Sequence, residues 1–355
     1  MKQKYYTTER IEKIKAQYNI LLGERSNGKS YAVKYLSLYD AYKKGDEFIY
    51  LRRWQLETKA SSVEYYFKDA PISAITDGKY DSVIVNRGKI YLCRFDVETN
   101  TYENKFLVGH VMYLSGETHF KSFSYPKVAN MIFEEFVTRD GYLPNECDKL
   151  MSLVSTVARR RSIRVWLIGN TISRLNPYFS EWGLRGVPYQ KQGTIEVYTF
   201  NTTQVDENGE PVSIKIAVEF CENSGNNSKM FFGKSSEMIT TGAWETKEFP
   251  HLEFSRSEYD LLYAVKISHM DISVGVELLH KNGRYVAHVY PSPKKNINRE
   301  ISERFSLSPL VTTDFTIITK GDKILFDLLK RNKIAFSDNL TGSDFSAILK
   351  EKGGL

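Results

Sequence analysis

The sequence has few cysteines and no long apolar run, and each scarcity excludes a class of protein. Its 355 residues include three cysteines, Cys93, Cys147 and Cys221, which lie far apart and form no C-x-x-C pair. This spacing argues against a zinc site or a disulfide framework and predicts a reducing compartment such as the cytoplasm. The chain has no run of about 18 apolar residues and no apolar core near its first residue, so we expect neither a membrane span nor secretion.

The net charge and the histidine content do not indicate a particular class of function. The formal net charge is +6, which allows a polyanionic partner without requiring one. The six histidines are scattered. Hydrophobic residues make up 41% of the chain, and its length is sufficient for two domains with real cores.

The stretch "LLGERSNGKS" contains the full G-x-x-x-x-G-K-[ST] pattern. An apolar run over residues 18–22 precedes it, and a helical repeat of apolar and aromatic residues follows Ser30 and ends at Gly45. Strand, glycine loop and helix therefore occur in the order that a phosphate-binding loop requires. The alternative is a glycine-rich turn with an incidental lysine. The predicted nucleotide-binding residues are Gly23, Glu24, Arg25, Ser26, Asn27, Gly28, Lys29 and Ser30.

The residues of this loop have distinct expected roles. Gly23 and Gly28 let the backbone approach phosphates closely, because they carry no Cβ. Lys29 supplies a positive charge to the outer phosphates of ATP, and Ser30 offers its hydroxyl to Mg²⁺.

The remaining apolar runs predict an α/β fold with a mainly parallel sheet. Strands are expected at residues 47–54, 128–133 and 163–169. The last two deliver polar residues at their C-terminal ends, where ligands bind in open α/β sheets. Residues 82–116 predict an antiparallel β insertion, because β-rich runs alternate with turns. Residues 193–200 and 212–220 predict a further strand pair.

The later part of the chain differs in composition. We expect a P-loop ATPase domain over residues 1–222 and a linker over residues 223–249, which are rich in Ser, Asn and Gly. Residues 250–355 predict a smaller α+β domain, in which β-rich runs precede an amphipathic helix over residues 320–336.

Two adjacent carboxylates follow the strand "MIF". Glu134 is assigned to the Mg²⁺ shell and Glu135 to polarising the attacking water, a pairing that favours hydrolysis over transfer to a bound hydroxyl. Asn170, after the strand "VWLI", suits a sensor of the γ-phosphate. The alternatives are a solvated strand end for the two glutamates and a turn cap for Asn170.

The segments "GERSNGKS", "SYPKVANMIFEEF", "YLPNECDKL" and "ARRRSIRVWLIGNTISRLNPYF" together resemble the genome-packaging ATPases of phi29-like tailed phages, relatives of the large terminases. The similarity covers residues 20–179 well. It implies that Glu134 is the magnesium carboxylate, Glu135 the catalytic glutamate and Asn170 the sensor. Glu at position 134 departs from the usual Asp by one methylene group.

The resemblance also implies an arginine that acts on a neighbouring subunit and a basic residue ahead of the acidic strand. Arg159 matches the arginine best, with Arg160 and Arg161 left open, and Lys121 matches the basic residue. The implied setting is the host cytoplasm, with a homopentameric ring at the portal vertex of a procapsid and, as partners, double-stranded DNA, the portal (connector) and a structural packaging RNA.

The resemblance implies a C-terminal domain like a degenerate RNase H nuclease, which binds nucleic acid without cutting it. Asp271, Glu277 and Asp314 form no recognisable two-metal constellation, which agrees with that reading. Three other functions stay open: a helicase-like motor on single strands, a nuclease-competent terminase, and a nucleotide-binding regulator without turnover. The expected phosphate contacts of this domain are Lys294, Lys295, Lys330, Arg331 and Lys333.

Overall fold

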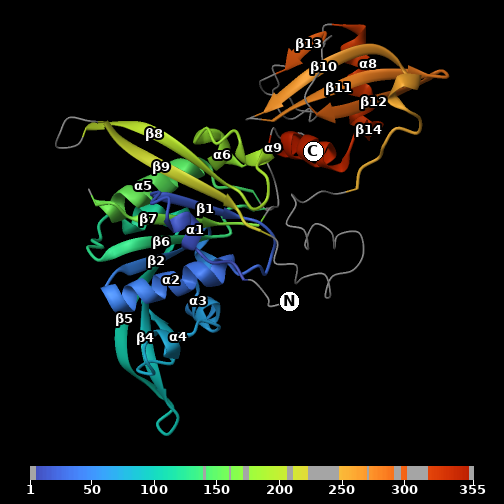
Figure 1. The fold of residues 1–355 in the computed structure, drawn as a ribbon. Helices are drawn as coiled ribbons and strands as arrows, with labels where there is room; N and C mark the ends of the chain where they lie inside the picture. Colours follow the sequence, from blue (N-terminus) through green and yellow to red (C-terminus); the bar gives the residue numbers. More distant parts are fainter. Residues whose placement is uncertain are drawn as a thin grey trace. The chain divides into compact units, whose positions relative to one another are not determined.

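The computed structural model describes residues 5–138, 141–159, 161–170, 176–205, 211–222, 248–269, 272–291, 297–301 and 319–351. The chain divides into two compact units (Figure 1). The first contains Met1–Thr171 and Tyr189–Ala243, and the second contains Ile172–Pro188 and Trp244–Leu355.

The first unit is built on a nine-stranded sheet in the order β3-β4-β5-β2-β6-β7-β1-β9-β8. Its centre is parallel: β2 pairs with β6, β6 with β7 and β7 with β1. These central strands are short apolar runs because both of their faces are buried. The strands are β1 Tyr18–Leu22, β2 Glu47–Arg52, β3 Ser82–Asn86, β4 Lys89–Asp96, β5 Thr101–Tyr113, β6 Val128–Glu134, β7 Arg164–Ile168, β8 Ile195–Val205 and β9 Pro211–Phe220.

The predicted parallel strands, the antiparallel insertion and the later strand pair are confirmed. The insertion and the pair are not separate sheets, since β5 pairs in parallel with β2 and β9 pairs in parallel with β1. The strand expected over residues 47–54 ends at Arg52, so Arg53 and Trp54 belong to the turn that follows.

Helices cover both faces of the central sheet. Helix α2 packs on β2, β5, β6 and β7. The connections β1–α2–β2 and β6–α5–β7 run in opposite directions along the sheet, so right-handed crossovers place α2 and α5 on opposite faces (Figure 1). The helices are α1 Glu9–Glu12, α2 Lys29–Lys44, η1 Gln55–Thr58, α3 Ala60–Phe67, α4 Ile72–Ile75, η2 Leu114–Phe120 and α5 Glu146–Ala158.

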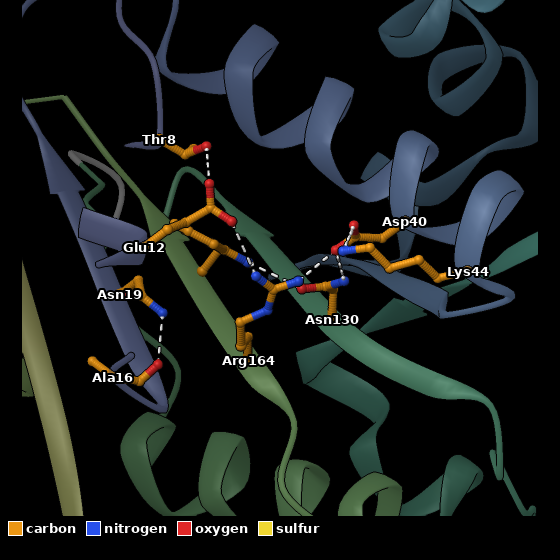
Figure 2. Close-up of polar contacts among 9 residues, drawn as sticks. Thr8, Glu12, Ala16, Asn19, Asp40, Lys44, Asn130 and Arg164 are labelled. Carbon is orange, nitrogen blue, oxygen red and sulfur yellow. Dashed lines mark hydrogen bonds and ion pairs between the residues drawn. The ribbon is translucent and has the colours of Figure 1, made fainter. Parts of the chain in front are cut away.

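An ion-pair network centred on the buried Asp40 ties α2 to the sheet near the helix C-terminus (Figure 2). Asp40 is fully buried, and its carboxylate pairs with Lys44 Nζ at 2.7 Å and with the Arg164 guanidinium at the start of β7. Arg164 also contacts Glu12 of α1, with NH1 and Oε1 3.1 Å apart. Helix α2 therefore has fixed ends: the phosphate-binding loop at one and this network at the other.

The second unit contains a five-stranded mixed sheet in the order β13-β10-β11-β12-β14. Helices α8 and α9 contribute Leu325, Phe345 and Ile348 to its apolar core. The elements of the unit are α6 Pro177–Glu181, η3 Val187–Tyr189, η5 Arg256–Glu258, β10 Asp260–His269, β11 Ile272–Lys281, β12 Arg284–Pro291, β13 Arg299–Ile301, α8 Lys320–Lys330, β14 Ile334–Phe336 and α9 Asn339–Glu351.

The helix expected over residues 320–336 is too long. Helix α8 ends at Lys330, and Ile334–Phe336 form β14, which pairs in parallel with β12. Asn332 breaks the helix with a left-handed backbone, φ 54°. The apolar residues beyond Asn332 match the spacing of a helix in the sequence, but in the structure they form the buried strand β14.

The predicted linker, residues 223–249, lies outside the described residues except for its last two positions. The expected domain limits, 1–222 and 250–355, stay a prediction. No helix among the described residues is long and apolar enough to cross a membrane.

Candidate nucleotide site

A cavity of about 770 Å³ opens where the central parallel strands end. The P-loop contributes Arg25 to Ser30, β6 and the residue after it contribute Glu134 and Glu135, and β7 leads into Asn170. The predicted residues at the ends of separate strands are thus brought to one cavity, as the geometry of an open parallel sheet requires. Gly23 and Glu24 belong to the loop but do not line the cavity.

The P-loop backbone is shaped by Gly28 at the N-terminus of α2. Its φ of 97° is a conformation that side-chain-bearing residues rarely adopt. A Cβ at this position would lie 3.4 Å from the Cβ of Tyr5 and from the backbone nitrogen of Tyr6. The N-terminal segment is held there because the Tyr6 N–H donates to the Asn27 carbonyl at 3.0 Å.

Lys29 is buried at the base of the cavity. Its ammonium donates to the Glu24 carbonyl at 2.5 Å and to Asn27 Oδ1 at 3.2 Å. Burial lowers the pKa of Lys29, while the charges of Glu134 and Glu24 act in the opposite direction. An anion in the cavity would compensate the buried charge, so the site favours a phosphate.

Glu134 is the last residue of β6 and is 5% exposed. Ser30 Oγ donates to its Oε2 at 3.1 Å, and the Tyr66 hydroxyl donates to its Oε1 at 2.7 Å. Burial raises the pKa of Glu134, and the two hydrogen bonds oppose that rise. Ser30 and Glu134 together present hard oxygen donors at the cavity wall, which is the donor set that Mg²⁺ prefers, so these residues fit the ion.

Glu135 directly follows β6 and extends toward solvent, with its side chain 63% exposed. Its backbone is left-handed, φ 56°, which is costly for a residue with a side chain. Arg52, at the end of the neighbouring β2, holds the carboxylate with NH2 and Oε2 2.8 Å apart. The same NH2 lies 2.6 Å from Glu57 Oε1, so two carboxylates share one nitrogen.

Arg53 forms hydrogen bonds to the backbone at Glu135 and at the residue after it. Its NH1 donates to the Glu135 carbonyl at 3.0 Å and its NH2 to the Phe136 carbonyl at 2.7 Å. It also makes a bidentate ion pair with Glu146 of α5, with Nε 2.8 Å from Oε2 and NH2 2.9 Å from Oε1. Both side chains are buried. These bonds stabilise the left-handed turn against its intrinsic cost.

Asn170 lines the cavity beyond β7, next to Gly169. A Cβ on Gly169 would lie 2.8 Å from Val137 Cγ2 and 2.9 Å from Phe136 Cε1. The absence of a side chain therefore lets the turns after β6 and β7 approach each other. Asn170 and Glu135 reach the same cavity as a result.

The basic residues predicted to assist catalysis lie elsewhere. Arg159 caps α5, and its guanidinium donates to the Phe123 carbonyl at 2.8 Å. Lys121 is exposed in the same loop before β6. Arg161 donates to the carbonyls of Tyr125, Val128 and Val157. Neither Lys121, Arg159 nor Arg161 lines the cavity. Arg160 lies outside the described residues.

Several residues that contact Glu134 or Glu135, or that line the cavity, were not predicted from the sequence. Arg52 ends the parallel strand β2 and Arg53 follows it, so the criterion that identified Glu134 and Asn170 could have identified them as well. Tyr66, on α3, had no such indication, because its position depends on how α3 folds against β2. The N-terminal residues Tyr5 to Thr7 also line the cavity.

The mainly parallel sheet, the glycine loop at the start of α2 and the acidic end of β6 define the class of P-loop nucleotide-binding α/β proteins. The chain belongs to the family of podovirus DNA encapsidation proteins (Gp16), whose family model matches residues 1–298. The resemblance noted from the sequence motifs is confirmed.

Two curated relatives and one solved structure illustrate the similarity. The chain is 31% identical over 182 residues to the DNA packaging protein of Bacillus phage phi29, covering 50% of each chain. It is 35% identical over 170 residues to that of Bacillus phage B103, covering 47% of this chain and 48% of the other. The aligned part thus spans about half the length of these relatives.

A chain from the bacteriophage phi29 viral genome packaging motor assembly has a similar fold, with a TM-score of 0.56 and 21% identity over 98% of this chain and 99% of that one.

Proposed function

We propose that this chain is an ATP-driven motor that moves double-stranded viral DNA into a preformed procapsid by Mg²⁺-dependent ATP hydrolysis. The observation that carries the proposal is the single cavity lined by Lys29, Ser30, Glu134, Glu135 and Asn170. Family membership and the packaging roles of the phi29 and B103 relatives support the choice of DNA as the cargo.

The chemistry follows from the positions of the side chains. Lys29 leaves its carbonyl and amide partners to bind the outer phosphates, and the N–H groups at the start of α2 bind the remaining phosphate oxygens. Mg²⁺, held by Ser30 and Glu134, would neutralise charge that builds on the phosphates. Glu135 orients the attacking water and accepts its proton, after Arg52 has released the carboxylate. Asn170 reports the state of the γ-phosphate.

The proposal is tested by ATP hydrolysis of the full chain alone, with double-stranded DNA, with single-stranded DNA and with empty procapsids. We expect stimulation by double-stranded DNA and procapsids, and loss of all turnover in Lys29→Ala. Preferential stimulation by single strands would replace the proposal with a helicase-like motor. Binding of ATP without any turnover would indicate a nucleotide-dependent regulator.

The second unit is proposed to contact nucleic acid or the portal without cutting DNA, as a degenerate RNase H-like domain. Glu277 supports this, because its carboxylate is occupied by Arg256 Nε at 2.7 Å and by His288 Nδ1 at 3.3 Å. Asp271, Asp314, Lys294 and Lys295 lie outside the described residues. Metal-dependent nicking of plasmid by the full chain would instead favour a nuclease-competent terminase.

We further propose that the chain acts as a pentameric ring at the portal vertex, in which an arginine of one subunit acts on the nucleotide of its neighbour. A structural packaging RNA is proposed among its partners. Arg159 contacts the loop before β6, whereas Glu134 ends that strand. The seven residues of β6 separate the two by roughly 20 Å, at about 3.3 Å per residue. This separation supports action on a neighbouring subunit's nucleotide over action on its own.

Mixing two inactive variants tests this role of Arg159. Arg159→Ala should lose about 10³-fold or more in turnover, as expected for an arginine that stabilises the transferred phosphoryl group. Mixed with Glu135→Gln subunits, it should regain hydrolysis, because its intact Glu135 meets an intact Arg159 from its neighbour. No recovery in mixed rings, verified by mass measurement, would exclude the intersubunit role.

A further inference from the structure

The carboxylate of Glu134 is held at both oxygens by hydroxyls from different elements. Ser30, in the first turn of α2, contacts Oε2. Tyr66, near the end of α3, contacts Oε1. Because the side chain is 5% exposed, water has little access to replace either donor. The two bonds therefore fix which oxygen faces the phosphate-binding loop.

Tyr66 is itself held firmly by its surroundings. Its ring packs on Tyr50, with centroids 4.7 Å apart, and Lys34 Nζ lies 4.3 Å from its centroid. Lys34 also donates to the Tyr66 carbonyl at 2.5 Å and pairs with Asp69.

A glutamate at this position needs such a restraint more than an aspartate would. The additional methylene adds a rotatable bond, so an unrestrained carboxylate could present either oxygen, or neither, toward Ser30. The Tyr66 hydroxyl occupies Oε1 and leaves Oε2 as the oxygen that faces the Ser30 hydroxyl. That oxygen and the hydroxyl are the pair assigned above to Mg²⁺.

We propose that Tyr66 is a positioning residue for the magnesium site: it orients the Glu134 carboxylate, and thereby sets the affinity for the Mg²⁺–nucleotide complex, without touching the ion or the nucleotide. This inference rests on the proposed ATPase function. It concerns metal affinity and therefore has a readout that is independent of hydrolysis.

The test is the binding of a fluorescent non-hydrolysable ATP analogue to the full chain, titrated with Mg²⁺ and repeated in EDTA. In Tyr66→Phe we expect the Mg²⁺ concentration for half-maximal enhancement of binding to rise about tenfold, the usual scale for losing a hydrogen bond to a metal ligand. Binding in EDTA should be unchanged. The matched control is Tyr65→Phe, which removes the hydroxyl of the adjacent, 74% exposed tyrosine and should behave as wild type.

A second variant separates orientation from general damage. In a Glu134→Asp background the shorter side chain has fewer rotatable bonds to restrain. Adding Tyr66→Phe there should therefore raise the Mg²⁺ concentration for half-maximal enhancement by less than it does in the wild type. Unchanged Mg²⁺ dependence in Tyr66→Phe would overturn the inference, as would equal weakening with Mg²⁺ and in EDTA. Failure of the wild type to bind the analogue at all would instead remove the proposed function.

Discussion

Replacing Glu135 with Gln is expected to leave ATP binding near the wild-type level and to reduce turnover by about 10²–10⁴-fold, because an amide cannot accept a proton from the attacking water. Replacing Lys29 with Ala should abolish binding itself, since that ammonium is the buried positive charge of the loop. The two variants therefore separate binding from chemistry. Nucleotide affinity and steady-state hydrolysis are measured on the same preparations.

The control for Glu135→Gln is Glu103→Gln, which alters an exposed carboxylate on β5 that does not line the cavity. It should hydrolyse ATP at the wild-type rate. Turnover near the wild-type level in Glu135→Gln would assign the catalytic role to a different group. Retained nucleotide binding in Lys29→Ala would contradict the assignment of the phosphate site.

The largest effect on stability is expected from Arg53→Met. The change leaves the Glu146 carboxylate buried without its positive partner, which costs about 3–5 kcal/mol in comparable buried pairs. It also removes the bonds to the Glu135 and Phe136 carbonyls, so any protein that still folds should turn over ATP more slowly. Chemical denaturation of the full chain, followed by tryptophan fluorescence, measures the loss.

Two further variants define the origin of that loss. Arg53→Met combined with Glu146→Leu removes both buried charges and should be less destabilised than Arg53→Met alone. Lys43→Ala breaks a solvent-exposed pair with Asp77 and should lower the free energy of unfolding far less. If Arg53→Met costs no more than Lys43→Ala, the buried pair does not support the turn after β6.

Much of the nucleotide site could be predicted because its components follow local patterns. Each central strand is an apolar run, and two of these runs lead to a polar residue that reaches the cavity: Glu134 ends β6, and Asn170 lies two residues beyond β7. The glycine loop is recognised by the fixed spacing of its residues in the sequence. The apolar runs do not indicate the order of the strands in the sheet. The pairing of β2 with β6 places Arg52 and Arg53 beside Glu135.

Other features depended on backbone conformation or on tertiary packing. The left-handed Asn332 ends α8 and turns an apparent helical repeat into strand β14. Tyr66, on α3, lies next to Glu134 because its ring packs on Tyr50 of β2. No spacing within the sequence relates residue 66 to residue 134.

The position of β1 in the sheet leaves one of its edges unpaired while the chain is being synthesised, and in any fragment that lacks β9. This strand is made early, yet it lies between β7 and β9, and one of its two partners ends only at Phe220. Until β9 emerges from the ribosome, an apolar strand that carries the P-loop has an unpaired edge, the kind of edge that promotes aggregation. A nucleotide-binding fragment for expression should therefore extend through Phe220, because truncation after β7 would expose this edge permanently.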